Sequence, residues 1–251
     1  MSVDGSCAEI HDSCRGKGSF NGAIRGIRTL QRHRINVAVR VTIHRNNVND
    51  LENTAHLLLE ELGLANFSTN SAGYLGTCRL NADDVLLNIQ ERKLAMATLL
   101  RLAEKYPDRI SANAGPLADG YAWRRMEKAR AQGAQAFPNG GRLTGCGCTS
   151  NKIAVRADGT IVPCIMLAHM ELGRINEDPL LDVWQHSLAL NQLRRRYTIP
   201  LTESEFCAGC SYIPYCTGNC PGLAYTLTDS IDRPSPDACL RRFLEEGGVI
   251  A

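Results

Sequence analysis

Eight of the eleven cysteines of this 251-residue chain lie after residue 145, and they constrain the fold more than any other feature. The first residues, Met1–Gly5, have neither a basic nor an apolar run, so we expect a cytoplasmic chain with reduced thiols. The odd total and the CxxC pair Cys207–Cys210 favour metal binding over a disulfide framework. The eight are Cys146, Cys148, Cys164, Cys207, Cys210, Cys216, Cys220 and Cys239.

These eight thiols can serve two different metal chemistries. Thiolates are soft ligands that select zinc or iron–sulfur clusters. Either kind of centre takes four thiolates, so the array is large enough for two centres. The segment after Cys207 has few apolar residues, which is typical of a fold that depends on bound metal. The spacing alone leaves structural zinc and iron–sulfur clusters open.

The first part of the chain alternates helices with strands, which predicts a parallel α/β sheet. Ser19 is the expected N-cap of the first clear helix. Three visible strands are too few to close a barrel. The predicted strands are 36–43, 66–70 and 110–114, and the predicted helices are 19–30, 49–62, 83–106 and 121–131.

The second part has a different character. The Gly/Pro/Asn-rich stretch Phe137–Arg142 predicts a boundary, which gives one domain at residues 1–135 and another at 136–251. A hairpin with an Asp158–Gly159 turn is predicted between residues 152 and 162. A helix follows at 180–196. The charged run Arg194–Arg196 at its end suits the helix dipole, and we expect it on a solvated face.

The charge pattern argues against two classes of partner. The formal net charge is +2, and acidic and basic residues are mixed along the chain. Such a balance gives no sign of a nucleic-acid partner. The longest apolar runs, such as Ala55–Leu59, are far too short to span a membrane, so we expect no membrane partner either.

The sequence around the cysteines resembles the SPASM domain, the auxiliary-cluster module at the C-terminus of many radical S-adenosylmethionine (SAM) enzymes. The resemblance covers residues 146–243 and includes seven cysteines at matching gaps. The matching segments are Ala154–Cys164 (AVRADGTIVPC), Leu172–Ile175 (LGRI), Leu181–Trp184 (LDVW) and Cys216–Gly222 (CTGNCPG).

The resemblance implies two auxiliary 4Fe–4S clusters whose ligands interleave along the sequence. Three cysteines would hold the first cluster and four would hold the second. Cys146 is the nearby candidate that would complete the first cluster; without it, one iron would have an open site. The implied ligands are Cys148, Cys164 and Cys220 for the first cluster, and Cys207, Cys210, Cys216 and Cys239 for the second.

The N-terminal part resembles the middle of a radical SAM barrel. The similar segments are Ser2–Gly5, Ile10–Asp12, Arg15–Gly16 and Gly18–Phe20. This resemblance implies an α/β fold: a partial (βα) barrel, made of the later βα units of a radical SAM barrel, followed by the loop-rich, cysteine-rich SPASM domain.

SAM or substrate contacts are implied at the carboxyl ends of the barrel strands. Ser2 and Asp4 are the candidates on the SAM side, although Ser2 reads equally well as a turn residue. The polar residues after Val41 and Ser68–Ser71 are also in position. Arg40 and His44 read either as site residues or as strand residues that face solvent. The pair His11–Asp12 is expected to buttress the following helix, and Cys7, Cys14 and Cys78 are expected to be ordinary thiols.

One element of the family pattern is missing. No CxxxCxxC motif, whose three thiolates hold the cluster that binds SAM, occurs in the sequence. The resemblance therefore implies a truncated frame or a split enzyme whose SAM-cluster half lies on a separate chain. This chain is not expected to cleave SAM by itself, and whether it is an enzyme stays open. Ile165 follows Cys164, so the aspartate base of some members does not carry over, which favours a peptide-modifying type.

Three functions follow from these observations. The first is the C-terminal portion of a radical SAM/SPASM maturase that acts on a ribosomally synthesised peptide or protein. Its auxiliary clusters would carry electrons or bind substrate, with a ferredoxin or flavodoxin as electron donor and SAM only in the complete enzyme. The second is a non-catalytic iron–sulfur module for electron transfer or peptide binding. The third is a zinc-stapled structural domain, and metal content separates it from the other two.

Overall fold

The computed structural model describes residues 1–144 and 146–250. It divides into two compact units. The first comprises Met1–Arg124 together with the C-terminal residues from Leu244, and the second comprises Arg125–Phe243. The division falls inside helix α7 (Pro116–Ala131), ahead of the Gly/Pro/Asn-rich stretch at which the sequence predicts a boundary.

The first unit is built on a small parallel sheet, as the alternation of helices and strands predicts. Its strands lie in the order β1 (Val39–Ile43), β2 (Phe67–Ser71), β3 (Ile110–Ala112). The first residues of the chain extend this sheet, because Ser2 forms a parallel bridge with Arg40. The sheet is open, in agreement with the partial barrel implied by the resemblance.

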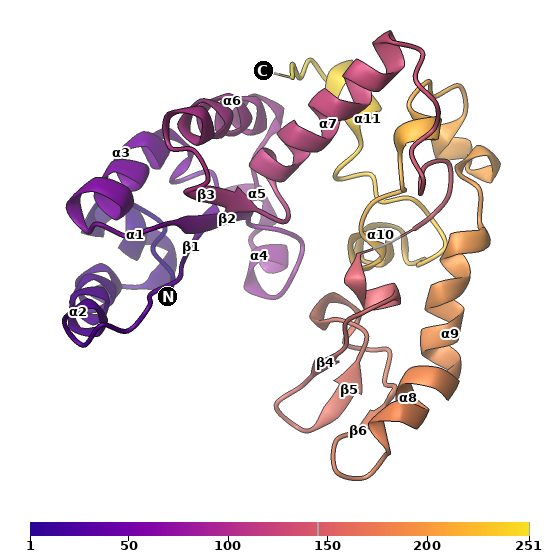
Figure 1. Cartoon of the computed structure of the whole chain (residues 1–251), viewed down its shortest axis with the longest axis horizontal. Helices are drawn as coiled ribbons and strands as arrows, with labels where there is room; N and C mark the ends of the chain where they lie inside the picture. Colours follow the sequence, from indigo (N-terminus) through magenta and orange to yellow (C-terminus); the bar gives the residue numbers. More distant parts are fainter. Residues whose placement is uncertain (145, 251) are drawn as a thin grey trace. The chain divides into compact units, whose positions relative to one another are not determined.

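Helices connect successive strands of this sheet (Figure 1). Leu58 and Leu99 of these helices are buried, and so are Val41 and Ile43 of β1. Alternation along β1 buries these valine and isoleucine side chains and leaves Arg40 exposed. The helical segments are α1 (Ala8–Arg15), α2 (Ser19–Arg32), η1 (Val48–Asp50), α3 (Leu51–His56), the π-helical turn η2 (Leu57–Glu61) and α6 (Ile89–Lys105).

The predicted helix 83–106 is wrong at its start. Two short helices, α4 (Thr77–Leu80) and α5 (Ala82–Val85), precede an extended stretch. The long helix α6 then begins at Ile89 because Asn88 and Glu91 form a capping box. The Asn88 side-chain oxygen accepts from the Glu91 backbone N–H at 2.9 Å, and the Glu91 carboxylate accepts from the Asn88 backbone N–H at 2.8 Å.

The predicted N-cap at Ser19 is also wrong. Gly18, in a left-handed conformation with φ of 84°, occupies that position. The Asp12 carboxylate supplies the missing acceptor, receiving the backbone N–H groups of Gly18 at 2.6 Å and Phe20 at 2.8 Å. These bonds hold the pKa of Asp12 below its usual value. The expectation that His11–Asp12 buttresses this helix is confirmed.

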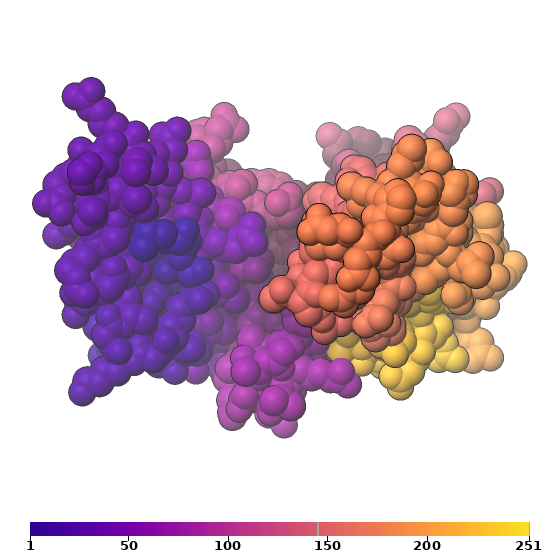
Figure 2. Space-filling view, turned by 90° about the horizontal axis from the view of Figure 1, so that it is seen from below, coloured from indigo at the N-terminus to yellow at the C-terminus, as the bar shows by residue number. Residues whose placement is uncertain are grey.

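The second unit begins with a three-stranded antiparallel sheet. Strands β4 (Ala154–Val155) and β5 (Thr160–Val162) confirm the predicted hairpin, and β6 (Gly173–Arg174) adds an unpredicted third strand. The predicted helix 180–196 is two helices, α8 (Leu180–His186) and α9 (Leu188–Arg194). Ser187 separates them and caps α9 by accepting from the Leu190 backbone N–H at 3.4 Å. Their surface is orange in Figure 2.

The rest of the second unit is made of short turns and two helices, around two small apolar clusters that each contain a cysteine. One cluster is Cys148 with Leu167, Leu190 and Leu193, and the other is Cys207 with Leu143 and Leu201. The turns and helices are η3 (Gly147–Thr149), η4 (Ile165–Leu167), η5 (Arg195–Thr198), η6 (Leu201–Glu203), η7 (Glu205–Cys207), η8 (Ile213–Tyr215), α10 (Pro221–Thr228) and α11 (Leu240–Glu245).

The expected solvated face at Arg194–Arg196 is wrong for its last residue. The side chain of Arg196 is fully buried. The helix α9 ends at Arg194, and Arg196 lies in the 3₁₀ turn η5 that follows it. Two backbone carbonyls, those of Thr144 and Arg233, accept from its guanidinium.

Within residues 1–144 and 146–250, no helix combines the length and the apolar sequence that a membrane crossing requires.

Candidate metal centres

The first set of thiols is Cys146, Cys148, Cys164 and Cys220, which come from three separate places in the chain. Cys146 and Cys148 lie at η3, and their Sγ atoms are 3.5 Å apart. The buried Cys148 also interacts electrostatically with the side chains of Cys164 and Cys220. Cys220 interacts in turn with Cys146 and Cys164. The fold therefore brings Cys146 together with the three cysteines that the resemblance assigns to one cluster.

The second set is Cys207, Cys210, Cys216 and Cys239. All four line one small cavity. Burial raises the pKa of Cys216 to about 11, and the neighbouring thiols of Cys239, Cys207 and Cys210 add to the rise. Burial likewise raises the pKa of Cys207 and Cys239. These four are the cysteines that the resemblance assigns to the other cluster.

The thiols of each set lie close together, so their thiolate forms repel one another unless a positive charge lies nearby. The hydrogen bond between Cys146 and Cys148 lowers the pKa of Cys146 to about 5 and raises that of Cys148. Burial is the largest cause that raises the pKa of Cys220, and the thiols of Cys146 and Cys164 add to it. A cationic metal core relieves this repulsion, since thiolates are the form that binds metal. The donor set fits thiolate-ligated metal centres.

Backbone N–H groups are directed at several of these sulfur atoms. Met166 donates to the Cys164 Sγ at 3.3 Å, and Gly218 donates to the Cys216 Sγ at 3.4 Å. Cys220 immediately precedes α10 and accepts from backbone N–H groups in its first turn. Such N–H···S bonds stabilise thiolates and influence the potential of a bound cluster. The Cys220–Pro221 pair was the available sequence signal for this helix start, since proline favours the first helical position.

Across residues 1–144 and 146–250, no group of three or more His, Cys, Asp or Glu side chains is arranged to hold a single metal ion.

The first unit presents a polar row across its sheet. Ser2 is paired with Arg40, Arg40 with Ser68, and Ser68 with Ser111, one residue from each of four adjacent segments. Paired residues in a sheet share a face, so these four side chains lie on the same side. The guanidinium of Arg40 donates to the Ser68 hydroxyl at 3.5 Å. The opposite face carries the apolar core, so this row marks the polar face of the open sheet.

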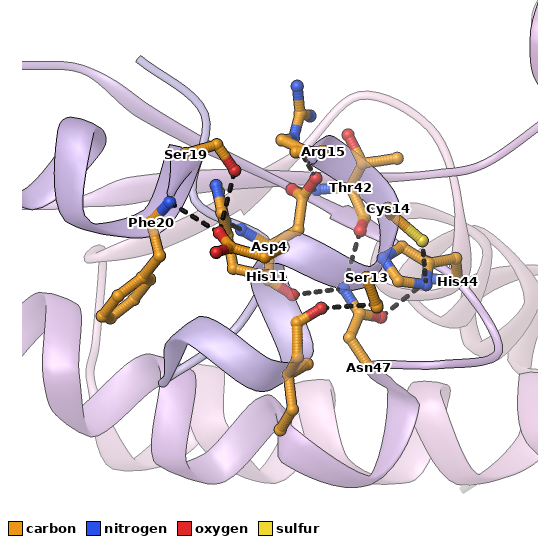
Figure 3. Close-up of polar contacts among 12 residues, drawn as sticks. Asp4, His11, Ser13, Cys14, Arg15, Ser19, Phe20, Thr42, His44 and Asn47 are labelled. Atoms are coloured by element: carbon orange, nitrogen blue, oxygen red, sulfur yellow. Dashed lines mark hydrogen bonds and ion pairs between the residues drawn. The ribbon is translucent and has the colours of Figure 1, made fainter. Parts of the chain in front are cut away.

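Asp4 is the centre of a buried polar network at the end of the first strand segment (Figure 3). Its carboxylate accepts from the Thr42 backbone N–H at 2.7 Å and pairs with Arg15. Its own backbone N–H donates to His11 Nδ1 at 2.9 Å, and its carbonyl accepts from Asn47 Nδ2 at 2.7 Å. Every polar group of Asp4 is thus engaged by the protein, which fixes the geometry of this strand end.

His44 lies next to this network, just after β1. It is buried, so its reading as a solvent-facing residue is wrong, whereas Arg40 is exposed. Burial lowers its pKa, and its Nδ1 lies 3.6 Å from the Cys14 Sγ. Its Nε2 and the Oδ1 of Asn70 in β2 are buried, and neither has a hydrogen-bond partner among the described residues. Sequence reasoning did not single out Asn70, which lies within the expected polar segment of β2.

Comparisons with known proteins agree with this arrangement. The family model described as "SPASM: Iron-sulfur cluster-binding domain" matches residues 146–211. The Fe-coproporphyrin III synthase of Methanosarcina barkeri is 28% identical over 87% of this chain and 56% of its own length. The mycofactocin maturase MftC of Mycolicibacterium smegmatis is 24% identical over 94% of this chain and 56% of its own length.

A solved structure shows the same fold. Streptococcus suis SuiB, crystallised bound to the precursor peptide SuiA, matches with a TM-score of 0.66 at 13% identity, over 96% of this chain and 52% of SuiB. The chain is a radical SAM/SPASM-domain protein. It spans about half the length of the curated relatives it matches, 56% of each of the two named above. In this radical SAM/SPASM-domain protein the matched span includes Cys146, Cys148, Cys164, Cys207 and Cys210, and the other three array cysteines follow it.

Proposed function

We propose that this chain is the C-terminal portion of a maturase that modifies a ribosomally synthesised peptide or protein, and that it binds two auxiliary 4Fe–4S clusters. The observation that carries the proposal is the convergence of eight thiols into two separate sets of four. Four thiolates are the usual complement of one 4Fe–4S cluster. The name of MftC, a maturase, supports the activity class of the whole protein.

The position of Cys146 bears on what the first cluster does. Its Sγ lies 3.5 Å from that of Cys148, and it interacts with Cys220 as well. We propose that it is the fourth ligand of this cluster. A fully ligated cluster has no iron site free for a substrate atom, so electron transfer is the role that we assign to it. A ferredoxin or flavodoxin would be the external electron donor.

The first unit would contribute binding and orientation. With a reduced SAM-binding cluster present, in an upstream segment or a separate chain, SAM would supply the 5′-deoxyadenosyl radical that abstracts hydrogen from the substrate. We propose that the Ser2 hydroxyl, which lies on the polar face of the sheet, contacts bound SAM. Asp4 would act as a positioning residue, because Arg15 and the Thr42 backbone already occupy its carboxylate. It fixes the strand end from which Ser2 projects.

A second candidate substrate is an iron porphyrin, which the name of the Methanosarcina relative favours. Titration of the cluster-loaded chain with iron coproporphyrin III, followed at the Soret band, distinguishes the two substrate classes. A saturable shift at stoichiometric porphyrin favours the tetrapyrrole, and no shift favours the peptide. Haemoglobin-derived haem serves as the control for unspecific binding to the apolar surface.

We predict that anaerobic reconstitution loads about eight iron and eight sulfide per chain, in line with two thiolate-ligated 4Fe–4S clusters. The measurement is iron and sulfide analysis of the purified chain, together with its visible charge-transfer absorbance and electron paramagnetic resonance (EPR) after reduction. Zinc added in place of iron is the matched control. Stoichiometric zinc without charge-transfer absorbance in the protein purified from cells would contradict the proposal and favour the zinc-stapled domain.

We predict that the cluster-loaded chain alone does not convert SAM to 5′-deoxyadenosine, because the sequence has no CxxxCxxC motif to hold the SAM-binding cluster. Chromatographic assay of 5′-deoxyadenosine after incubation with SAM and dithionite measures this. A known radical SAM enzyme, treated identically, is the positive control. Turnover by this chain would show that one of its own clusters binds SAM. Activity that appears only when a CxxxCxxC-bearing chain is added would favour the split enzyme.

A further inference from the structure

Arg196 is a buried arginine in the second unit that the proposed function does not yet explain. Its side chain is 0% exposed, whereas that of the neighbouring Arg195 is 61% exposed. Removing a guanidinium from water is costly unless hydrogen bonds and opposite charge replace the lost solvation. The surroundings of Arg196 therefore indicate what its charge is for.

Hydrogen bonds to the protein satisfy only part of this guanidinium. Its Nε donates to the Thr144 carbonyl at 3.2 Å, and its Nη1 donates to the Arg233 carbonyl at 3.4 Å. Both acceptors are neutral backbone groups. The Nη2 atom is buried and has no acceptor within the part of the chain that the structure describes. Hydrogen bonding alone thus leaves both a donor and the positive charge without full compensation.

The opposite charge near Arg196 comes first from the Asp232 carboxylate and then from two thiols of the first set. Three side chains favour its charged form: Asp232, Cys220 and Cys148. Two of these three are proposed cluster ligands. The Asp232 carboxylate also lies 3.5 Å from the guanidinium of the exposed Arg195, so the two arginines share this negative charge. The guanidinium therefore lies within electrostatic range of two proposed ligands of the first cluster.

Residues 194–197, which include Arg196, also bind residues next to the proposed ligands Cys146 and Cys148. Arg194 Nε donates to the Thr149 carbonyl at 3.2 Å, and the hydroxyls of Tyr197 and Thr149 lie 2.9 Å apart. Arg196 binds the Thr144 carbonyl on the other side of Cys146 and Cys148. Residues 194–197 thus bind Thr144 and Thr149, which flank Cys146 and Cys148 in the sequence.

We infer that Arg196 is a positioning residue of the cluster proposed on Cys146, Cys148, Cys164 and Cys220, and that its buried positive charge favours the reduced form of that cluster. This inference rests on the proposed function. A 4Fe–4S core with four thiolates is negatively charged, and reduction adds one electron to it. Nearby buried positive charge stabilises the more negative state, which raises the reduction potential.

The test is an EPR-monitored redox titration of the full-length, cluster-loaded chain and its Arg196→Gln variant. We expect one of the two redox transitions to move to lower potential. A tenfold fall in the equilibrium constant for reduction corresponds to a shift of about 59 mV for a one-electron couple. The transition of the other cluster should stay in place as an internal reference, since none of its thiols is among the groups that act on Arg196. Arg196→Lys, which keeps the charge, should restore most of the potential.

The matched control is Arg195→Gln, which removes the same charge from the adjacent, exposed position. Solvent screens that charge, so neither transition should move. An Arg196→Gln protein with wild-type iron and sulfide content and an unchanged potential would overturn the inference. An equal shift in Arg195→Gln would also overturn it, because the effect would then be one of net charge alone.

Arg196→Gln could fail to fold, and Asp232→Asn then decides the question. Removing this partly exposed carboxylate leaves the Arg196 charge less neutralised, so the same transition should move to higher potential. An unchanged potential in Asp232→Asn overturns the inference in that case. The proposed function has a separate test. A reconstituted wild-type chain that contains no iron and sulfide would refute it before any variant is compared.

Discussion

Removing two thiols from one set is expected to halve the iron content of the reconstituted chain, from about eight to about four atoms. The variant is Cys207→Ala/Cys216→Ala, which leaves only Cys210 and Cys239 around the small cavity of the second set. Two thiolates cannot hold a 4Fe–4S cluster that normally takes four. Iron and sulfide analysis and the loss of one of the two EPR signals measure the result.

Two further double variants make this prediction specific. Cys148→Ala/Cys220→Ala should remove the other four irons and the other EPR signal, because these residues belong to the first set. Cys14→Ala/Cys78→Ala removes the same number of thiols outside the array and should keep about eight irons. A folded array variant that keeps all of its iron, or loses all of it, would contradict the division of the thiols into two independent sets.

Removal of the metal is expected to unfold much of the second unit while the sheet of the first unit persists. The apolar clusters of the second unit are small, and each depends on a cysteine, Cys148 or Cys207. The first unit has a larger core of its own, which includes Leu58, Met96 and Leu99. Structural metals in small domains contribute about 10 kcal/mol or more to folding, so their loss removes most of the stability of such a domain.

Hydrogen–deuterium exchange of the cluster-loaded and chelated chains measures this effect. Backbone amides between Leu201 and Cys239 should lose protection by about 100-fold or more, as expected when a segment opens by local unfolding. The amides of β1, β2 and β3 in the same sample are the internal control and should keep their protection. Equal protection of Leu201–Cys239 with and without metal would show that this segment folds on its own apolar contacts.

Much of the candidate site could be predicted from the sequence because ligand identity and spacing are local properties. Seven thiols followed from their gaps and flanking segments. Cys146 could not be assigned in this way, since its interaction with Cys220, which is distant in the sequence, depends on the fold. The hairpin at Asp158–Gly159 followed from its turn residues, whereas the strand β6 has no comparable local signal.

The wrong predictions of helix bounds and exposure arose where a tertiary contact or a helix cap overrides the apolar periodicity of the sequence. The apolar spacing before Ile89 looks helical, yet the capping box of Asn88 and Glu91 sets the real start of α6. Ser187 interrupts the helix between α8 and α9 in the same way. Arg196 belongs to a charged run, and nothing in that run distinguishes it from the exposed Arg195. Only the fold reveals which of the adjacent arginines turns inward.

The interleaving of the two sets of thiols has a consequence for biosynthesis. Cys220, of the first set, lies in the sequence between Cys216 and Cys239 of the second. During synthesis a ribosome must therefore release residues through position 220 before the first set is complete, and through 239 before the second is. A cluster that bridges Cys216 and Cys239 closes a loop around Cys220, which shortens the search of that thiol for its own partners. Cluster insertion is thus expected to be ordered, and a chain that ends before Cys220 should acquire neither cluster stably.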